Sequence, residues 1–210
     1  MKKASKIIAI FMFAMSVFVG VGAVEVFAGT TSQTNTVNEP IKFIAKQKGK
    51  KVILKWNKSK NVKGYIIYKN GKKFKTLKKN KLTDKKVKKN KVYSYKIKAY
   101  TFANGKKVFS NSGQTVSIIV TDKKSKKVNA GRFKYIKNQY TISLNGKVKL
   151  QGEAYPSKKL KKKKVLSRKL TWSSSDTSLA TVNARGVVKA NNNMKTGTVI
   201  IYAKAHNGLT

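Results

Sequence analysis

Hydrophobic and polar residues alternate with a period of two along much of this 210-residue chain. In residues 93–100 (YSYKIKAY), Tyr93, Tyr95 and Ile97 fall on one side of the alternation, and lysines fall on the other. Residues 51–56 (KVILKW) show the same pattern. A period of two with lysine on the polar side is typical of half-buried antiparallel strands, so we predict a strand at each place.

Turn signals separate the alternating stretches. Asn-Gly pairs at 70–71, 104–105 and 145–146 favour tight turns, because a two-residue hairpin loop needs positive φ angles that these residues adopt. Short strands at near-regular spacing, without a long helical period, predict an all-β fold of two Ig-like β-sandwich modules in tandem. The predicted strands and hairpins lie in residues 51–56, 65–77, 93–100, 100–109, 115–121, 140–156 and 197–205.

The N-terminal segment has the pattern of a secretory signal peptide. Lysines precede a mostly apolar run at residues 7–24, and the tripeptide Val26-Phe27-Ala28 follows it. We therefore expect cleavage after Ala28 and a protein that is secreted or held at the cell surface. The alternative is an uncleaved membrane anchor, since the apolar run is about long enough to span a bilayer.

Three features carry a resemblance to a known fold family: Trp56, residues 64–72 (GYIIYKNGK) and residues 93–100. With these features, residues 40–121 resemble a fibronectin type III domain. The resemblance implies that Trp56 fills the core, and the alternation of the strand predicts that Tyr93, Tyr95 and Ile97 are buried with it. The resemblance also implies a tyrosine corner, in which the hydroxyl of Tyr93 bonds to nearby backbone.

A second resemblance rests on residues 170–190 (LTWSSSDTSLATVNARGVVKA). This stretch is similar to the hallmark of the bacterial group 2 Ig-like domain. The matching residues are Trp172, the serines and Asp176 that follow it, and the later Ala-Thr-Val and Gly-Val-Val. A Gly-Thr-x-x-Ile pattern follows at residues 197–201. The resemblance covers residues 134–210 and implies that Trp172, Val182 and Val187 belong to the core.

Two features depart from that family. The lysine-rich loop before Trp172 is longer than expected, and the chain stops where the family supplies one more strand. We therefore expect the last module to lack its final strand and to present an unpaired edge. The expected division of the chain is a signal peptide at 1–28, a linker at 29–39, a fibronectin type III-like domain at 40–121, a linker at 122–133 and an Ig-like domain at 134–210.

The charge is extreme: 49 Lys and Arg residues stand against 6 Asp and Glu residues, for a formal net charge of +43. Such a surface attracts polyanions without reading their shape closely. The strongest predicted polyanion-binding surface lies in one loop, where the charges add at one place; the alternative is a solvated surface with no partner. Its residues are Lys158, Lys159, Lys161, Lys162, Lys163, Lys164, Arg168 and Lys169.

Residues suited to catalysis or metal binding are scarce. Asp176 is open to three interpretations, a catalytic acid, a calcium ligand or a turn former, and its serine-rich context favours the turn. A nucleophilic serine needs a base, but the single histidine, His206, is expected on the solvent side near the chain end. No cysteine and a single histidine make a zinc or transition-metal site improbable. We therefore expect no catalytic residue, no metal site and no cofactor.

The aromatic residues allow two interpretations. Trp56 and Trp172 could stack on sugars, but their places in alternating strands favour the core. Exposure is open for four others, Tyr68, Tyr100, Phe102 and Phe109.

These features predict a non-catalytic secreted or cell-surface adhesion or spacer protein. Its expected partners are anionic cell-wall polymers or polyanionic glycans, with membrane contact only by surface charge or an uncleaved signal. One alternative is a non-catalytic fragment of a larger secreted carbohydrate-active enzyme. Another is a non-specific heparin or nucleic-acid binder, since few arginines and no recognition helix argue against sequence-specific nucleic acid.

Overall fold

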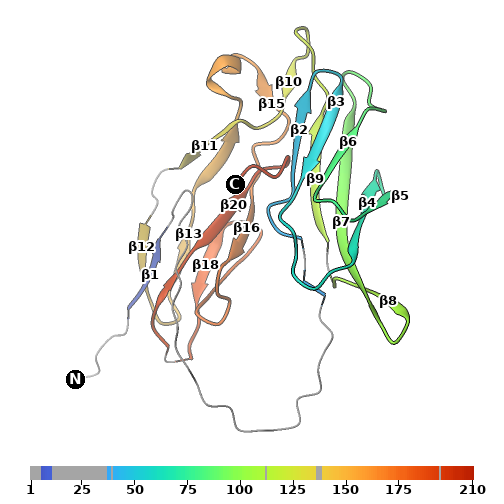
Figure 1. Cartoon of the computed structure of the whole chain (residues 1–210). Coiled ribbons are helices and arrows are strands. Elements are labelled where there is room, and N and C mark those ends of the chain that lie inside the picture. The colour runs from blue at the N-terminus through green and yellow to red at the C-terminus, as the bar shows by residue number, and fades with distance from the viewer. Residues whose placement is uncertain (1–5, 11–36, 39, 112, 136–138, 194) are drawn as a thin grey trace, which may run out of the picture.

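The computed structural model describes residues 6–10, 37–38, 40–111, 113–135, 139–193 and 195–210. Its described residues form twenty strands and one short 3-10 helix, η1 (Lys158–Leu160). Because the described residues contain strands and almost no helix, the all-β fold class is confirmed. Most strand pairs are antiparallel. The strands gather into two groups, and the C-terminus lies between them (Figure 1). We call residues 37–121 the N-terminal region and residues 122–210 the C-terminal region; their division into separate domains stays a prediction.

Two sheets build the N-terminal region. The first has the order β2-β3-β6, and the second has the order β5-β4-β7-β8 with β9 also paired to β7. The strand bounds are β2 (Ile44–Lys48), β3 (Lys51–Lys55), β4 (Gly64–Lys69), β5 (Lys72–Leu77), β6 (Lys81–Asp84), β7 (Val92–Ala103), β8 (Lys106–Phe109) and β9 (Gln114–Ile119).

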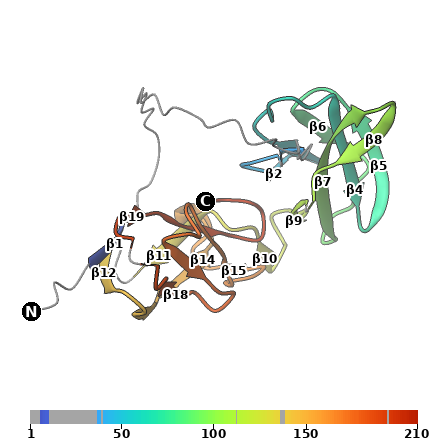
Figure 2. The same ribbon diagram turned by 90° about the horizontal axis from the view of Figure 1, so that it is seen from below.

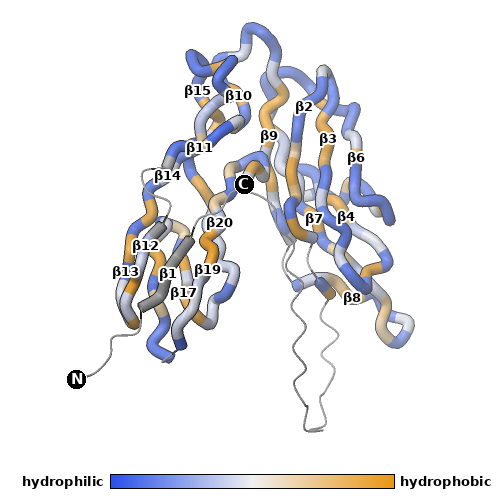
Figure 3. Tube along the Cα trace, turned by 60° about the vertical axis from the view of Figure 1, so that its left-hand side comes forward, coloured by the Kyte–Doolittle hydropathy of each residue, from blue (hydrophilic) through white to orange (hydrophobic). Residues whose placement is uncertain are grey.

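Alternation along these strands places the core between the two sheets. Tyr95 and Ile97 of β7 are fully buried, and Trp56 is 3% exposed. The Trp56 ring meets the rings of Phe43 and Tyr65 edge-on, with centroids 5.9 and 5.3 Å away. Hydrophobic and hydrophilic residues are interspersed along the strands of this region in the hydropathy coloring (Figure 3). A single cluster of large apolar side chains therefore holds the two sheets together.

The Asn-Gly turns behave differently in the two regions. Asn70-Gly71 joins the paired strands β4 and β5, and Asn104-Gly105 joins β7 and β8, all four residues having positive φ. Asn145 also has a positive φ, of 59°, but the strands on either side pair with different partners. The third Asn-Gly pair therefore makes a turn between strands and not a paired hairpin.

The strands of the C-terminal region form smaller sheets, with the orders β13-β18-β17, β16-β20, β11-β14, β10-β15 and β12-β1-β19. Their bounds are β10 (Lys127–Val128), β11 (Arg132–Tyr135), β12 (Gln139–Ser143), β13 (Lys147–Lys149), β14 (Gly152–Tyr155), β15 (Lys164–Val165), β16 (Thr171–Ser174), β17 (Ala180–Val182), β18 (Val187–Ala190), β19 (Thr198–Val199) and β20 (Ile201–Lys204). Figure 2 shows this group beside the N-terminal region from a second direction.

Trp172 packs against both apolar clusters of the C-terminal region and is half-buried. Val182 is half-buried against one of them. Val187 departs from the expected core, because it is only half-buried while its neighbour Val188 is 0% exposed. Val188 lies opposite Val148 in the β13–β18 pair, and successive side chains of a strand point to opposite faces, so Val187 points away from the core.

The predicted signal peptide and linkers are only partly described. Residues 1–5, 11–36 and 39 lie outside the described residues, so most of the predicted segments 1–28 and 29–39 are untested. Lys6–Ile10 forms β1, antiparallel to β12 and parallel to β19. In the predicted linker 122–133, Val128 of β10 is buried, because β10 pairs with β15. Among the described residues, no helix has the length and apolar character to cross a membrane.

Candidate anion-binding surface

An open groove of about 1010 Å³ lies on the C-terminal region. Strands β11, β13, β14 and β16 and the turn before β18 bring its lining residues together from distant parts of the chain. Within the described residues that line it, five side chains are cationic and Glu153 alone is acidic. The cations are Lys134, Lys149, Arg168, Lys169 and Arg185, all of them exposed. The groove therefore presents a strongly positive surface to solvent.

Tyr155 is one of two aromatic residues that line the groove in the described part of the chain. Its hydroxyl donates a 2.9 Å hydrogen bond to Oε2 of Glu153, which raises the pKa of Tyr155. The guanidinium carbons of Arg132 and Arg168 lie 5.1 and 5.2 Å from the ring centroid, within the range of cation–π contacts. All three arginines of the chain thus lie in or beside the groove, since Arg185 also lines it.

Arg168 also forms an ion pair with Glu153, with Nη1 3.5 Å from Oε2. Both side chains are about half exposed or more, so water and salt screen this pair and it contributes little to stability. An anion of a ligand can compete for the Arg168 guanidinium at small cost. A planar guanidinium can also bind phosphate or carboxylate through two parallel hydrogen bonds, which a lysine ammonium cannot do.

The apolar lining of the groove comes from Leu150, Leu170 and Trp172. Leu150 and Leu170 are buried, and Trp172 shares its half-buried side chain between the core and the groove. Gly186 permits this placement, because a Cβ there would lie 3.0 Å from the Trp172 ring, and its φ is +78°. Trp172 therefore packs against the core and also lines the groove, while its possible stacking on a sugar stays a prediction.

The predicted lysine loop does not act as one free patch. Lys158, Lys159, Lys161 and Lys162 are exposed in and after η1, and Lys164 is exposed in β15. Lys163 is half-buried, and its Nζ donates to the carbonyl oxygens of Lys123 and Ser125 at 2.7 and 2.9 Å. Arg168 and Lys169 line the groove, whereas the loop lysines do not. The predicted surface is therefore divided into three parts: exposed lysines of the loop and β15, the hydrogen-bonded Lys163, and the groove residues Arg168 and Lys169.

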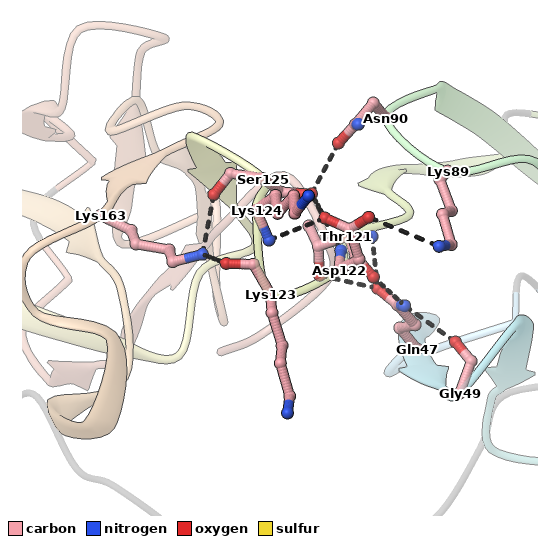
Figure 4. A network of polar contacts seen from close by, with 10 residues as sticks. All are labelled: Gln47, Gly49, Lys89, Asn90, Thr121, Asp122, Lys123, Lys124, Ser125 and Lys163. Carbon is pink, nitrogen blue, oxygen red and sulfur yellow. Dashed lines mark hydrogen bonds and ion pairs between the residues drawn. The ribbon is translucent and has the colours of Figure 1, made fainter.

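Lys163 belongs to a joint between the two regions (Figure 4). The Ser125 hydroxyl lies 2.6 Å from Oδ1 of Asn90 and 3.0 Å from Oδ1 of Asp122. Gln47 bonds to the backbone of Thr121 through both ends of its side-chain amide. Hydrogen bonds to the segment 121–125 thus come from the N-terminal region and from the lysine loop.

The chain end supplies a second connection between the regions. The backbone amide of Ser117 in β9 donates to the carbonyl of His206 at 2.6 Å. The amide of Ala45 in β2 donates to the carbonyl of Asn207 at 2.9 Å. His206 differs from its expected solvent-side position: it is half-buried with both ring nitrogens enclosed, because this segment lies against β2 and β9. Burial lowers the pKa of His206, and the nearby Ser167 backbone partly offsets that effect.

The Ser-Ser-Ser-Asp stretch ends β16 and leads into a turn: Ser173 and Ser174 belong to the strand, and Asp176 helps to form the turn, as its serine-rich context predicts. Oδ1 of Asp176 accepts a 2.8 Å bond from the Ser178 amide, and the Asp176 amide donates to Oγ of Ser174. The Ser175 hydroxyl accepts the Ile200 amide at 2.9 Å, which ties the turn to the neighbouring strand. Hydrogen bonding by Ser178 lowers the pKa of Asp176. All these contacts serve local backbone geometry.

Sequence reasoning missed a buried ionic cluster in the N-terminal region. Asp84 is 1% exposed, and its Oδ2 lies 2.6 Å from Nζ of Lys69 and 2.7 Å from the Tyr95 hydroxyl. Burial alone would raise the pKa of Asp84, but hydrogen bonds from Lys69 and Tyr95 outweigh it and hold that pKa below its usual value. Asp84 reaches this position because β6 pairs with β3, where Asp84 lies opposite Val52. No local sequence motif predicts this pairing.

Comparisons with known proteins show limited similarity. No family model and no curated protein matches the chain. The solved structures that it resembles include a β-1,2-glucanase from Parabacteroides distasonis (26% identity, TM-score 0.36), over 42% of this chain and 13% of that one. A spore cortex lytic enzyme from Clostridium perfringens matches with 23% identity and a TM-score of 0.33, over 41% of this chain and 28% of that one.

The central fibronectin-III array of RIM-binding protein matches with 14% identity and a TM-score of 0.35, over 85% of this chain and 72% of that one. The chain thus spans less than a third of the length of the two enzymes, and all three TM-scores are below 0.5. The β-sandwich architecture rests on the strand pairing itself. The bacterial Ig-like resemblance of residues 134–210 stays a prediction.

Proposed function

We propose that this chain is a non-catalytic adhesion or spacer protein, secreted or held at the cell surface, that associates with anionic envelope polymers. The groove and the exposed lysines of the neighbouring loop bind the polymer together. The observation that carries the proposal is the convergence of five cationic side chains and a single acidic one on one groove. Phosphate or carboxylate groups along a chain fit such a surface, since each neutralised charge releases a counterion.

The described carboxylates support the non-catalytic part of the proposal. Asp84 is used in a buried structural cluster, Asp122 in the joint and Asp176 in a turn. Glu153 is engaged by Tyr155 and Arg168 at the edge of an open groove. Acid–base catalysis needs a carboxyl group positioned for proton transfer to substrate, and the contacts that these groups make support a structural role for each of them.

The groove also favours a glycan over a nucleic acid as the polymer. Its lining combines guanidinium groups with the half-buried side chain of Trp172, against which a sugar ring can pack. A non-catalytic fragment of a larger carbohydrate-active enzyme would use the same surface. The two functions differ in the charge of the ligand. A neutral sugar would bind through aromatic side chains with little dependence on salt, whereas an acidic polymer would bind with a steep dependence.

Salt titrations of polymer binding test the proposal. We expect the protein to bind teichoic acid and heparin tightly at low salt and weakly above physiological salt. Arg168→Ser with Arg185→Ser should weaken binding without unfolding the protein, because both side chains are exposed. Replacing four loop lysines with serine should reduce the salt slope by about 2–4, close to one per lost contact. These four are Lys158, Lys159, Lys161 and Lys162.

The matched control removes four exposed lysines from the N-terminal region. They are Lys72, Lys73, Lys75 and Lys78. If this control reduces the slope as much as the loop variant, the charge acts diffusely and the assigned surface is wrong. Salt-independent binding to one neutral sugar would support the enzyme-fragment alternative instead.

A further inference from the structure

The β7–β8 hairpin exposes two phenylalanines on the outer face of the N-terminal region. Phe102 is 52% exposed and Phe109 is 38% exposed. In the strand register Tyr100 lies opposite Phe109, and Phe102 lies opposite Lys107, so these four residues share one face of the sheet. The hairpin extends beyond the body of the region (Figure 1). Exposed aromatic residues gathered on a projecting element mark an interaction surface.

The three rings form an angled cluster. Tyr100 meets Phe102 at 90° with centroids 6.0 Å apart, and meets Phe109 at 58° with centroids 6.5 Å apart. Nζ of Lys107 lies 4.5 Å from the centroid of Tyr100 and 5.7 Å from that of Phe102. A sugar ring stacks on a flat, open aromatic face, and here an ammonium group lies over such faces. The geometry therefore disfavours a sugar-binding platform.

Positive charge surrounds the cluster. The hairpin, residues 100–109 (YTFANGKKVF), contains two exposed lysines and no acidic residue. Lys63 is also exposed, and its amide donates to the carbonyl of Tyr100 at 2.9 Å, so its backbone lies next to that of Tyr100. Aromatic side chains with lysines around them match the interface of an anionic bilayer, where rings enter the headgroup region and ammonium groups stay at the surface.

We propose that the β7–β8 hairpin inserts Phe102 and Phe109 into the headgroup layer of an anionic lipid bilayer. Lys106 and Lys107 then contact lipid phosphates, and Tyr100, which is 8% exposed, supports the two phenylalanines from below. This surface lies on the N-terminal region and is separate from the polymer groove. The insertion therefore does not depend on polymer binding, and either can fail without the other.

Site-specific labelling can test the insertion, because the chain has no cysteine. Lys106→Cys places one thiol directly after the Asn104-Gly105 turn, and Lys72→Cys places one directly after the matching Asn70-Gly71 turn. Both positions are exposed and both changes remove one lysine, so the two variants are matched. An environment-sensitive fluorophore on each thiol then reports local contact with vesicles of phosphatidylglycerol and phosphatidylcholine.

We expect the label at position 106 to shift to the blue and to be quenched by bilayer nitroxides, and the label at position 72 to stay in water. Adding Phe102→Ser and Phe109→Ser should weaken vesicle partitioning by about tenfold or more. Val92→Ser, which removes another exposed apolar side chain, should leave partitioning unchanged. Because the label reports only its own surroundings, a retained N-terminal apolar segment does not change the readout.

Three results would overturn the proposal. The first is a label at position 106 that stays in water while the protein is bound to vesicles, which would leave only surface electrostatics. The second is equal quenching at positions 106 and 72. The third is a phenylalanine-dependent interaction with a soluble glycan or protein in the absence of any vesicle response, which would assign the hairpin to another partner.

Discussion

The Tyr95 hydroxyl donates a 2.7 Å hydrogen bond to Oδ2 of Asp84, a carboxylate enclosed between the two sheets of the N-terminal region. Lys69 completes the cluster, and its Nζ also donates to the carbonyl of Lys86 at 2.6 Å. A buried charge is tolerated only when it is paired and hydrogen-bonded, so the three side chains depend on one another.

Asp84→Asn should lower the free energy of unfolding by about 3 kcal/mol, because it leaves the mostly buried Lys69 ammonium without its counter-ion. Asp176→Asn, at an exposed turn, should cost less than about 1 kcal/mol and serves as the control. Urea unfolding of both variants measures the difference. Equal effects would show that the cluster does not stabilise the fold.

Acid should act on the same cluster. Hydrogen bonds hold the folded-state pKa of Asp84 below the unfolded value of about 3.8. The carboxylate therefore stabilises the folded protein above pH 3.8, and that contribution disappears as the pH falls further, through the folded-state pKa. Thermal melts between pH 5 and 2 should show a loss of stability that Asp84→Asn lacks. A wild-type melt that changes no more than the variant would contradict this role.

Tyr93→Phe removes the hydroxyl that accepts a 2.8 Å hydrogen bond from the Lys88 amide, five residues upstream. This bond has the form expected of a tyrosine corner. The prediction that Tyr93 is buried is wrong: it is half-buried at the edge of the core, and the bond is exposed, so water can replace the hydroxyl in part. We expect a loss of about 1 kcal/mol in unfolding free energy. Tyr202→Phe, at an exposed side chain, is the control, and an equal loss there would mean that the corner has no special effect.

The protein should lose some stability in mild acid because of His206 near the chain end. Burial lowers the folded-state pKa of His206 below 6.5, so the folded protein favours the neutral imidazole. Its contribution to stability is complete above pH 6.5 and decreases as the pH falls through the folded-state value. Melting temperatures at pH 7.5 and 5.5 should therefore differ more for the wild type than for His206→Leu. The same difference in both proteins would exclude His206 as the cause.

The N-terminus of exported protein is a direct test of the signal peptide. We expect intact mass measurement to show a chain that begins at Gly29. A chain that retains Met1 would instead support a membrane anchor.

Removal of residues 1–28 would also take away β1, which pairs with β12 and β19. We expect the backbone amides of β12 and β19 to exchange faster in the processed protein than in the uncleaved chain, because an open strand edge exposes its amides. The β4–β7 pair, which has no contact with β1 in the strand pairing, provides the reference. Unchanged exchange at β12 and β19 would show that β1 does not protect this edge.

Local pattern predicted strands such as β3 and β7, because burial on one face of a sheet imposes a period of two, but it did not indicate others, such as β2 and β6. The hairpins at Asn70-Gly71 and Asn104-Gly105 followed from the positive φ that their turns require. Long-range pairing could not be predicted in the same way. Nothing in the neighbourhood of Asn145 indicates that the strand after it pairs with β18, about forty residues later.

The groove shows the same limit. Lys134, Arg168 and Arg185 come from separate parts of the chain, and only the fold brings them together. The sequence did indicate Arg168 and Lys169, but it grouped them with loop lysines that lie outside the groove. It also treated Lys163 as equal to its neighbours, although Lys163 bonds to the backbone of the joint. Charge alone cannot distinguish a lysine that is free to bind a ligand from one that forms structural hydrogen bonds.

The carbonyls of His206 and Asn207 are held by two different strands of the N-terminal region, β9 and β2. The two regions are therefore connected at the chain end as well as through residues 121–125. A flexible linker would let two binding surfaces sample many separations, and their effective concentration for each other would depend on linker length. Here the spacing between the groove and the β7–β8 hairpin is set by the fold. Avidity for an envelope that presents polymer and lipid together would then depend on whether the distance between those two layers matches this spacing.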